Sequence, residues 1–186
     1  LTYNLGDVTA EGILPVEKKV NIGSSVKIPV NTTLYVDGMT LTGWTDGTNT
    51  YTAGQELTVN EDVALTPVFT ANEVSLADRT EAVTVKWYFG EGNGAGTINA
   101  QGKSTILVVQ ATVNDKVIDV KMDIDATNGK ANNVGRGDAW AQVNKGTILA
   151  IPSCKGAEVS ISAYGTMGAE GKTATTIEGV NTYTSG

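Results

Sequence analysis

The sequence predicts an all-β chain in two parts, a small module over residues 1–72 and an antiparallel β-sandwich over residues 73–186. Apolar residues alternate with polar ones over short runs rich in Thr and Val, which is the pattern of half-buried strands. Turns such as Asp-Gly and Ala-Gly separate these runs, and no segment shows the helical period of about 3.6 residues. Between residues 70 and 81 the apolar pattern lapses and the charge rises, so we expect the boundary there.

Each strand expected in the first part is a short apolar-polar run that ends at a turn. The runs are SSVKIPV (24–30), TLYVDG (33–38), MTLTGWTDG (39–47), NTYTAGQELTV (49–59) and DVALTPVF (62–69).

The clearest strands of the second part form a predicted hairpin. STILVVQATV (104–113) reaches an Asn114-Asp115 turn, and KVIDVKMDID (116–125) follows it. The second run alternates strictly, so we expect its aliphatic residues on one face and Asp119, Lys121, Asp123 and Asp125 on the outer face. Further strands are expected at 82–89, 139–143, 146–152 and 157–165, with a final pair at KTATTIEG (172–179) and NTYTS (181–185).

A glycine-rich stretch at residues 88–105, YFGEGNGAGTINAQGKST, resembles a nucleotide-binding loop but has the wrong spacing. A P-loop requires a glycine five positions before Gly102, where Thr97 stands, and the third glycine of a dinucleotide motif would also fall at that position. Both motifs must open a helix, whereas strand-like residues follow here. We therefore predict a loop between strands.

The composition argues against several function classes. The chain has no histidine and one cysteine, Cys154, so His-activated nucleophiles and His-rich metal sites are excluded. We therefore expect the chain not to be catalytic. An enzyme that uses paired carboxylates is a third alternative, beside the two non-catalytic functions given at the end of this section. The sequence has no apolar run of about 18 residues, so no membrane insertion is predicted. A net charge of −7 argues against nucleic acid as a binding partner.

The positive charges are concentrated in the second part. Residues 73–186 hold ten of the thirteen Lys and Arg residues, with a net charge of −2, whereas residues 1–72 have a net charge of −5. An acidic ligand is therefore expected to bind to the second part.

Residues 41–69, LTGWTDGTNTYTAGQELTVNEDVALTPVF, resemble the Listeria–Bacteroides repeat, a small β-grasp-like module of bacterial surface proteins. The matching features are Gly-Trp-x-Asp-Gly, Tyr-x-Ala-Gly and Asp-Val-x-Leu-Thr. The resemblance implies a spacer in a secreted or cell-surface multidomain bacterial chain. Trp44 and Tyr51 could stack on sugars, but core packing around the Asp46-Gly47 turn is the preferred interpretation.

Residues 80–165 resemble the β-sandwich modules attached to bacterial pectate lyases. The words that carry the resemblance are VKWYF (85–89), DIDATNGK (123–130), GDAWAQVNKGTILAIP (137–152) and KGAEVSISAYG (155–165). In the pectin-binding kind, surface cations pair with uronate carboxylates, and the matching positions are Lys130, Arg136 and Lys145. The chain ends before the last strands that the resemblance would require, so we expect it to be part of a longer protein.

The same segment supplies polar groups suited to sugar hydroxyls. Asn132 and Gln142 are candidates for these contacts, and Trp140 is a candidate for stacking or for the core. A solvated loop, with Arg136 paired to Asp138, is the structural alternative.

The words DIDATNGK also raise the question of calcium. Asp123 and Asp125 fit the start of an EF-hand, but Asn128 is one residue late and Val134 stands where a bidentate Glu belongs. An EF-hand is excluded, while a structural calcium held by loop carbonyls and one Asp stays open.

The sequence thus predicts a non-catalytic carbohydrate-binding and spacer fragment of a secreted bacterial polysaccharide-degrading protein. Its expected partners are a uronate-containing polysaccharide such as pectin and the other domains of the parent chain. The alternative is a structural or adhesive fragment of a cell-surface protein that binds no sugar.

Overall fold

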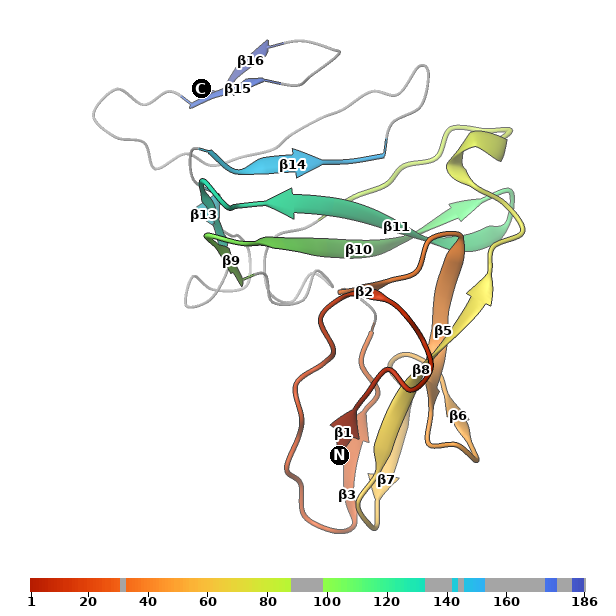
Figure 1. Cartoon of the computed structure of the whole chain (residues 1–186). Helices are drawn as coiled ribbons and strands as arrows, with labels where there is room; N and C mark the ends of the chain where they lie inside the picture. The colour runs from red at the N-terminus through yellow and green to blue at the C-terminus, as the bar shows by residue number, and fades with distance from the viewer. Residues whose placement is uncertain are drawn as a thin grey trace. The chain divides into compact units, whose positions relative to one another are not determined.

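The computed structural model describes residues 1–30, 33–87, 99–132, 142–143, 146–152, 173–176 and 182–185 (Figure 1). Nearly all of the regular structure is strand, and the single helical element of these residues is the 3-10 turn η1 (Leu76–Asp78). The all-β prediction is therefore confirmed. The chain forms two compact units, residues 1–154 and 155–186. The boundary predicted near residues 70–81 lies within the first unit, and no strand pairing between described residues crosses it.

Residues 2–71 form three small sheets. The largest has the order β1-β8-β5-β6, with β1 parallel to β8 and the other neighbours antiparallel; the other two are the antiparallel pairs β2-β4 and β3-β7. The strands are β1 (Thr2–Tyr3), β2 (Glu11–Gly12), β3 (Ser24–Lys27), β4 (Leu34–Tyr35), β5 (Met39–Thr45), β6 (Thr50–Tyr51), β7 (Glu56–Val59) and β8 (Ala64–Ala71).

The core of these sheets is built around Trp44. Its side chain is 2% exposed, and the ring of Tyr3 meets it edge to face with 5.1 Å between centroids. Leu41, Leu57 and Leu65 belong to the same buried cluster. The core-packing interpretation of Trp44 is confirmed, since a buried ring cannot stack on a sugar.

The Asp46-Gly47 turn explains the role of Tyr51. The Tyr51 hydroxyl donates to Asp46 Oδ2 at 2.6 Å, and the main-chain N–H groups of Thr48 and Asn49 donate to Asp46 Oδ1. The hydrogen bonds from Asn49, Tyr51 and Thr48 lower the pKa of Asp46 because they favour its ionised form. Tyr51 is thus used within the module to hold the turn that joins β5 to β6.

The predicted hairpin is present as β10 (Ser104–Val113) and β11 (Lys116–Asp125), which lie side by side along their whole length (Figure 1). Asn114 and Asp115 have φ angles of 46° and 64°, the left-handed conformation that a two-residue hairpin turn requires. β14 (Ile148–Ala150), within the predicted strand 146–152, pairs with β11 over Asp123–Asp125.

One face of the hairpin is covered by the segment that precedes it. Val83, Val85 and Trp87 are half-buried against Ile118 and other aliphatic residues of β10 and β11. Their neighbours Ala82, Thr84 and Lys86 are exposed, so burial alternates as in a strand. The strand prediction is nevertheless wrong for the described residues 82–87, which have no strand partner there.

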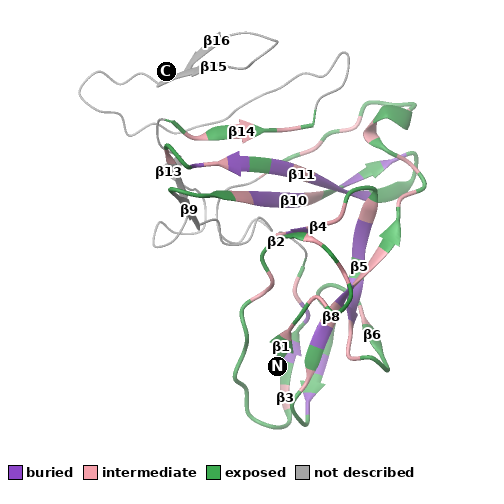
Figure 2. Ribbon diagram, viewed as in Figure 1, coloured by how far each residue is buried: buried purple, intermediate pink, exposed green. Residues whose placement is uncertain are grey.

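Part of the other face of the hairpin is buried as well, and this part includes Asp119, which was expected to point outward; Figure 2 shows buried, intermediate and exposed stretches along β10 and β11. Asp119 is 5% exposed, and Ile106 and Val108 on the same face are 8% and 1% exposed. Asp119 Oδ2 accepts a hydrogen bond from Leu41 N at 2.9 Å, and Asp119 N donates to Thr40 Oγ1 at 3.1 Å. Strand β5 of the first part therefore covers a face that alternation alone assigned to solvent.

The remaining strands form a second three-stranded sheet and a separate hairpin. The sheet has the order β13-β12-β9, with β9 (Asn99–Gln101), β12 (Lys130–Asn132) and β13 (Gln142–Val143). With the sheet β10-β11-β14 it gives the second part a sandwich-like set of two antiparallel sheets. Residues 155–186 contain the predicted final pair, β15 (Thr173–Thr176) and β16 (Thr182–Ser185).

Candidate functional site

Three of the six predicted ligand-binding residues belong to one small sheet. Lys130 and Asn132 are the first and last residues of β12, and Gln142 lies directly opposite Asn132 on β13. Positions two apart in a strand belong to the same face of a sheet, and so do directly opposed positions. The register therefore assigns Lys130, Asn132 and Gln142 to one face, although nine residues separate Asn132 from Gln142 along the chain.

The third strand adds two polar positions to that face. Gln101 of β9 is opposite Lys130, and Asn99 is opposite Asn132. The alternate positions of the sheet are Ala100, Ala131 and Val143. One face thus carries four carboxamide residues and one lysine, whereas the other carries small or aliphatic residues. We refer to positions 99, 101, 130, 132 and 142 as the amide face.

Sequence analysis missed β9 because Asn99 and Gln101 stand in the glycine-rich stretch predicted to be a loop. That prediction is wrong for residues 99–101. A weak signal was present, since Asn-Ala-Gln alternates polar and small residues just before the Gly102-Lys103 turn.

Two glycines, Gly129 and Gly146, allow a close main-chain approach at the turn before β12. A Cβ atom at Gly129 would meet the main-chain nitrogen of Thr147 at 2.5 Å, and one at Gly146 would clash with the carbonyl oxygen of Asn128. The turn before β12 therefore lies directly against the segment that leads into β14. Gly129 N also donates to Ala126 O at 3.1 Å, which closes this turn immediately before Lys130.

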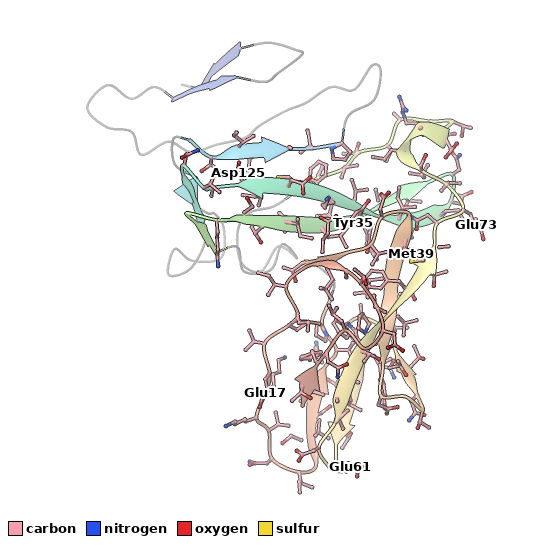
Figure 3. The ribbon with its side chains drawn as sticks, viewed as in Figure 1. Glu17, Tyr35, Met39, Glu61, Glu73 and Asp125 are labelled. Carbon is pink, nitrogen blue, oxygen red and sulfur yellow. The ribbon has the colours of Figure 1, made fainter. Side chains whose placement is uncertain are left out.

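Asp125 at the end of β11 organises the same turn (Figure 3). Its Oδ1 accepts hydrogen bonds from the hydroxyl of Thr127 at 2.6 Å and from Thr127 N at 2.9 Å. These bonds lower the pKa of Asp125. Among the described residues no group of three or more His, Cys, Asp or Glu side chains could hold a metal ion. The carboxylate is used to fix the start of β12, and calcium stays an untested expectation.

The other three predicted site residues, Arg136, Trp140 and Lys145, lie outside the described residues. The same holds for Asp138, the suggested partner of Arg136, and for Cys154.

A second polar cluster lies where the first part meets the hairpin. Lys121 Nζ contacts Glu11 Oε2 at 2.7 Å and Asp123 Oδ1 at 3.2 Å, and it lies 5.1 Å from the centre of the Tyr35 ring. Burial by itself favours the neutral amine, but the hydrogen bonds to Glu11 and Asp123 outweigh it and raise the pKa of Lys121. A surface hollow of about 580 Å³ adjoins this cluster and includes Tyr35, Asp119 and Lys121 in its lining.

Because these side chains contact one another, the cluster joins the first part of the chain to the hairpin within the first unit. We name the contacts of Thr40 and Asp119, together with the Lys121 contacts, the polar joint. No helix of the described residues is long and apolar enough to cross a membrane.

Comparison of the chain with family models, with curated proteins and with solved structures finds no match. The functional argument therefore depends on the chemistry of the residues themselves.

Proposed function

We propose that this chain is a non-catalytic carbohydrate-binding and spacer segment of a secreted or cell-surface bacterial protein that degrades polysaccharides. We further propose that it recognises an acidic plant polysaccharide such as pectin. The observation that supports the proposal is the register of β12 and β13, in which Lys130, Asn132 and Gln142 share one face.

The chemistry of this face suits a uronate polymer. Carboxamides both donate and accept hydrogen bonds, as sugar hydroxyls do, and a lysine ammonium pairs with a carboxylate. A single exposed ion pair contributes only about 0.2–1 kcal/mol. We therefore expect the affinity to come from several weak contacts along one polymer.

The first part serves as the spacer in this proposal, with residues 1–72 as the module and residues 73–186 as the binding domain. Its aromatic residues support that division, because Trp44 is buried and Tyr51 holds the Asp46 turn. The polar joint would then keep the spacer and the binding domain in a fixed relation.

The absence of histidine from the sequence supports the non-catalytic part of the proposal. Turnover of pectate by the purified chain, abolished by one substitution within it, would contradict this part.

The second candidate is a structural or adhesive segment that binds protein and no sugar. It is favoured by the exposed aliphatic residues between β2 and β3, where Val16 and Ile22 are 84% and 80% exposed. Exposed apolar groups of this kind are more typical of protein contacts than of sugar sites.

Affinity electrophoresis in gels that contain polygalacturonate distinguishes the two candidates. We expect Lys130→Ala, Arg136→Ala and Lys145→Ala each to reduce the retardation of the chain. Lys103→Ala is the matched control, since Lys103 is an exposed lysine in the turn between β9 and β10. If the three variants are retarded like the parent chain, the cationic site is wrong. A loss confined to Trp140→Ala would instead indicate a stacking site for neutral sugars.

A further inference from the structure

Exposed aliphatic side chains are concentrated in one segment of the first part. Seven large hydrophobic residues are exposed in the part of the chain whose side chains the structure describes, and five of them fall within residues 13–30. These five are Ile13, Val16, Val20, Ile22 and Val30. Exposed apolar groups that occur singly are common, whereas a group of them in one segment is typical of a contact surface.

The same segment carries all the positive side chains of the first part. Three lysines, Lys18, Lys19 and Lys27, stand against Glu17 and give residues 13–30 a net charge of +2. The other residues of 1–72 include seven Asp or Glu and no Lys or Arg. We name residues 13–30 the basic segment. A surface that complements it must offer carboxylates beside apolar groups.

The basic segment is tied to its module at two places. Lys18 N donates to Leu1 O, and Lys18 O accepts a hydrogen bond from Leu1 N, both at 3.0 Å. Near its end, Val26 and Ile28 are buried in the module core. The exposed side chains between these two places are therefore presented from a fixed position on the module.

The hollow beside the polar joint has apolar side chains in its lining. Its volume is about 580 Å³, which is within the range of about 300–1,000 Å³ that is usual for binding pockets. The half-buried residues Val74, Leu76 and Ile151 contribute to the lining. The hollow can therefore receive aliphatic side chains.

Carboxylates surround these apolar side chains. The exposed acidic residues of the lining are Asp37, Glu73, Asp78 and Asp123. The lining also includes Lys121, which is already paired with Glu11 and Asp123. Asp37 accepts a hydrogen bond from the Tyr35 hydroxyl at 3.0 Å, and this neutral partner leaves its negative charge available. The hollow thus matches the basic segment in both apolar character and charge.

The two matching surfaces lie on different sides of the same unit. Figure 3 labels Glu17 in the basic segment and Glu73 at the hollow, and the two residues lie well apart. Because the segment is tied to its module, it cannot reach the hollow of its own chain. The complementary segment must come from a second copy, and such a contact between unlike surfaces adds copies in an open chain.

We propose that the basic segment of one copy docks in the hollow of a second copy, so that the chain associates head to tail. The aliphatic side chains of the segment pack on Val74, Leu76 and Ile151, and its lysines lie beside the carboxylates. A contact confined to one hollow is smaller than the about 1,200–2,000 Å² that stable complexes bury, so the association is weak and depends on concentration. This inference is independent of sugar binding.

Sedimentation velocity of the parent chain measures the association directly. Between about 20 μM and 1 mM we expect the average sedimentation coefficient to rise past the value of a dimer, because each added copy leaves one segment and one hollow open. Raising the salt to about 1 M, where the Debye length is about 3 Å, should weaken the association severalfold.

Two double variants test the two surfaces separately. The segment variant combines Val16→Asp with Ile22→Asp, and the hollow variant combines Asp37→Lys with Glu73→Lys. All four positions are exposed, so the fold should be kept, which circular dichroism and urea unfolding establish. Each variant alone should associate at least about tenfold more weakly than the parent, through the lost burial of aliphatic groups in one and like-charge repulsion in the other.

The mixture of the two variants is the sharpest test. The segment variant keeps an intact hollow and the hollow variant keeps an intact segment, so an equal mixture should form dimers and nothing larger. Thr112→Asp is the control, since Thr112 is an exposed position of β10 that belongs to neither surface. It should associate within about twofold of the parent, as expected for a neutral surface change.

Four results would overturn the inference. The first is a parent chain that stays monomeric at about 1 mM. The second is a folded hollow variant that associates like the parent, which would mean that the segment packs on another surface. The third is a mixture of the two variants that forms no dimer. The fourth is a parent chain that binds vesicles of anionic phospholipid and does not self-associate, because the segment would then contact lipid.

Discussion

The polar joint predicts that one hydroxyl group contributes strongly to the stability of residues 1–154. Thr40 is 6% exposed, and its Oγ1 accepts a hydrogen bond from Asp119 N and donates to Asn72 Oδ1 at 2.7 Å. Thr40→Val keeps the size and branching of the side chain but removes both bonds. A buried N–H group that loses its partner costs about 1–3 kcal/mol.

We therefore expect Thr40→Val to lower the free energy of unfolding by about 2 kcal/mol, which for about 150 residues corresponds to a fall in Tm of about 4–8 °C. Urea unfolding followed by tryptophan fluorescence measures the change. Thr42→Val is the control, since Thr42 is an exposed residue on the same strand. It should shift the free energy of unfolding by less than about 0.5 kcal/mol.

The joint also predicts a change in proteolysis. If the contact between β5 and β11 loosens, the connection over residues 73–82 should be cleaved faster in Thr40→Val than in Thr42→Val. If the two variants unfold with the same free energy and are cleaved at the same rate, the joint does not hold the two parts together.

Three further predictions concern local contacts. The lowered pKa of Asp46 means that its contribution to stability is present above the unfolded-state pKa of about 4 and is lost as the pH falls below it. Asp46→Asn should therefore flatten the fall in the urea midpoint between about pH 6 and pH 3. Gly146→Ala should lower Tm more than twice as far as Gly54→Ala; both glycines have positive φ, but only Gly146 also meets a main-chain carbonyl. The exposed ion pair between Lys116 and Glu73 is 2.7 Å long, yet Lys116→Met should leave the urea midpoint unchanged within error.

The hairpin and the module core could be predicted from sequence because their signals are local. Strict alternation over 116–125 and an Asn114-Asp115 turn specify the hairpin of β10 and β11, and the Asp46-Gly47 turn specifies the end of β5. The burial of Asp119 could not be predicted in this way, since alternation assumes that the polar face meets water. Its signal was in the partner strand, where the unbroken apolar run 106–109 indicates cover on both faces.

The amide face was only partly predictable for a related reason. The chemistry of Lys130, Asn132 and Gln142 is legible in the sequence, but the pairing that unites them joins strands of two or three residues. Strands this short carry little propensity, and β9 contains Asn, Ala and Gln, which are poor strand formers. Its place is set by pairing with β12 across the intervening hairpin and not by its own residues.

The most direct test of the account is the dependence of polysaccharide binding on charge, measured on the parent chain. We predict that the chain binds polygalacturonate, that methyl esterification weakens this binding, and that raising salt from about 0.1 to 1 M weakens it further as the Debye length falls from about 10 to 3 Å. Longer polymers should bind more tightly than short oligomers. Equal affinity for esterified and de-esterified pectin, with no effect of salt, would contradict the account.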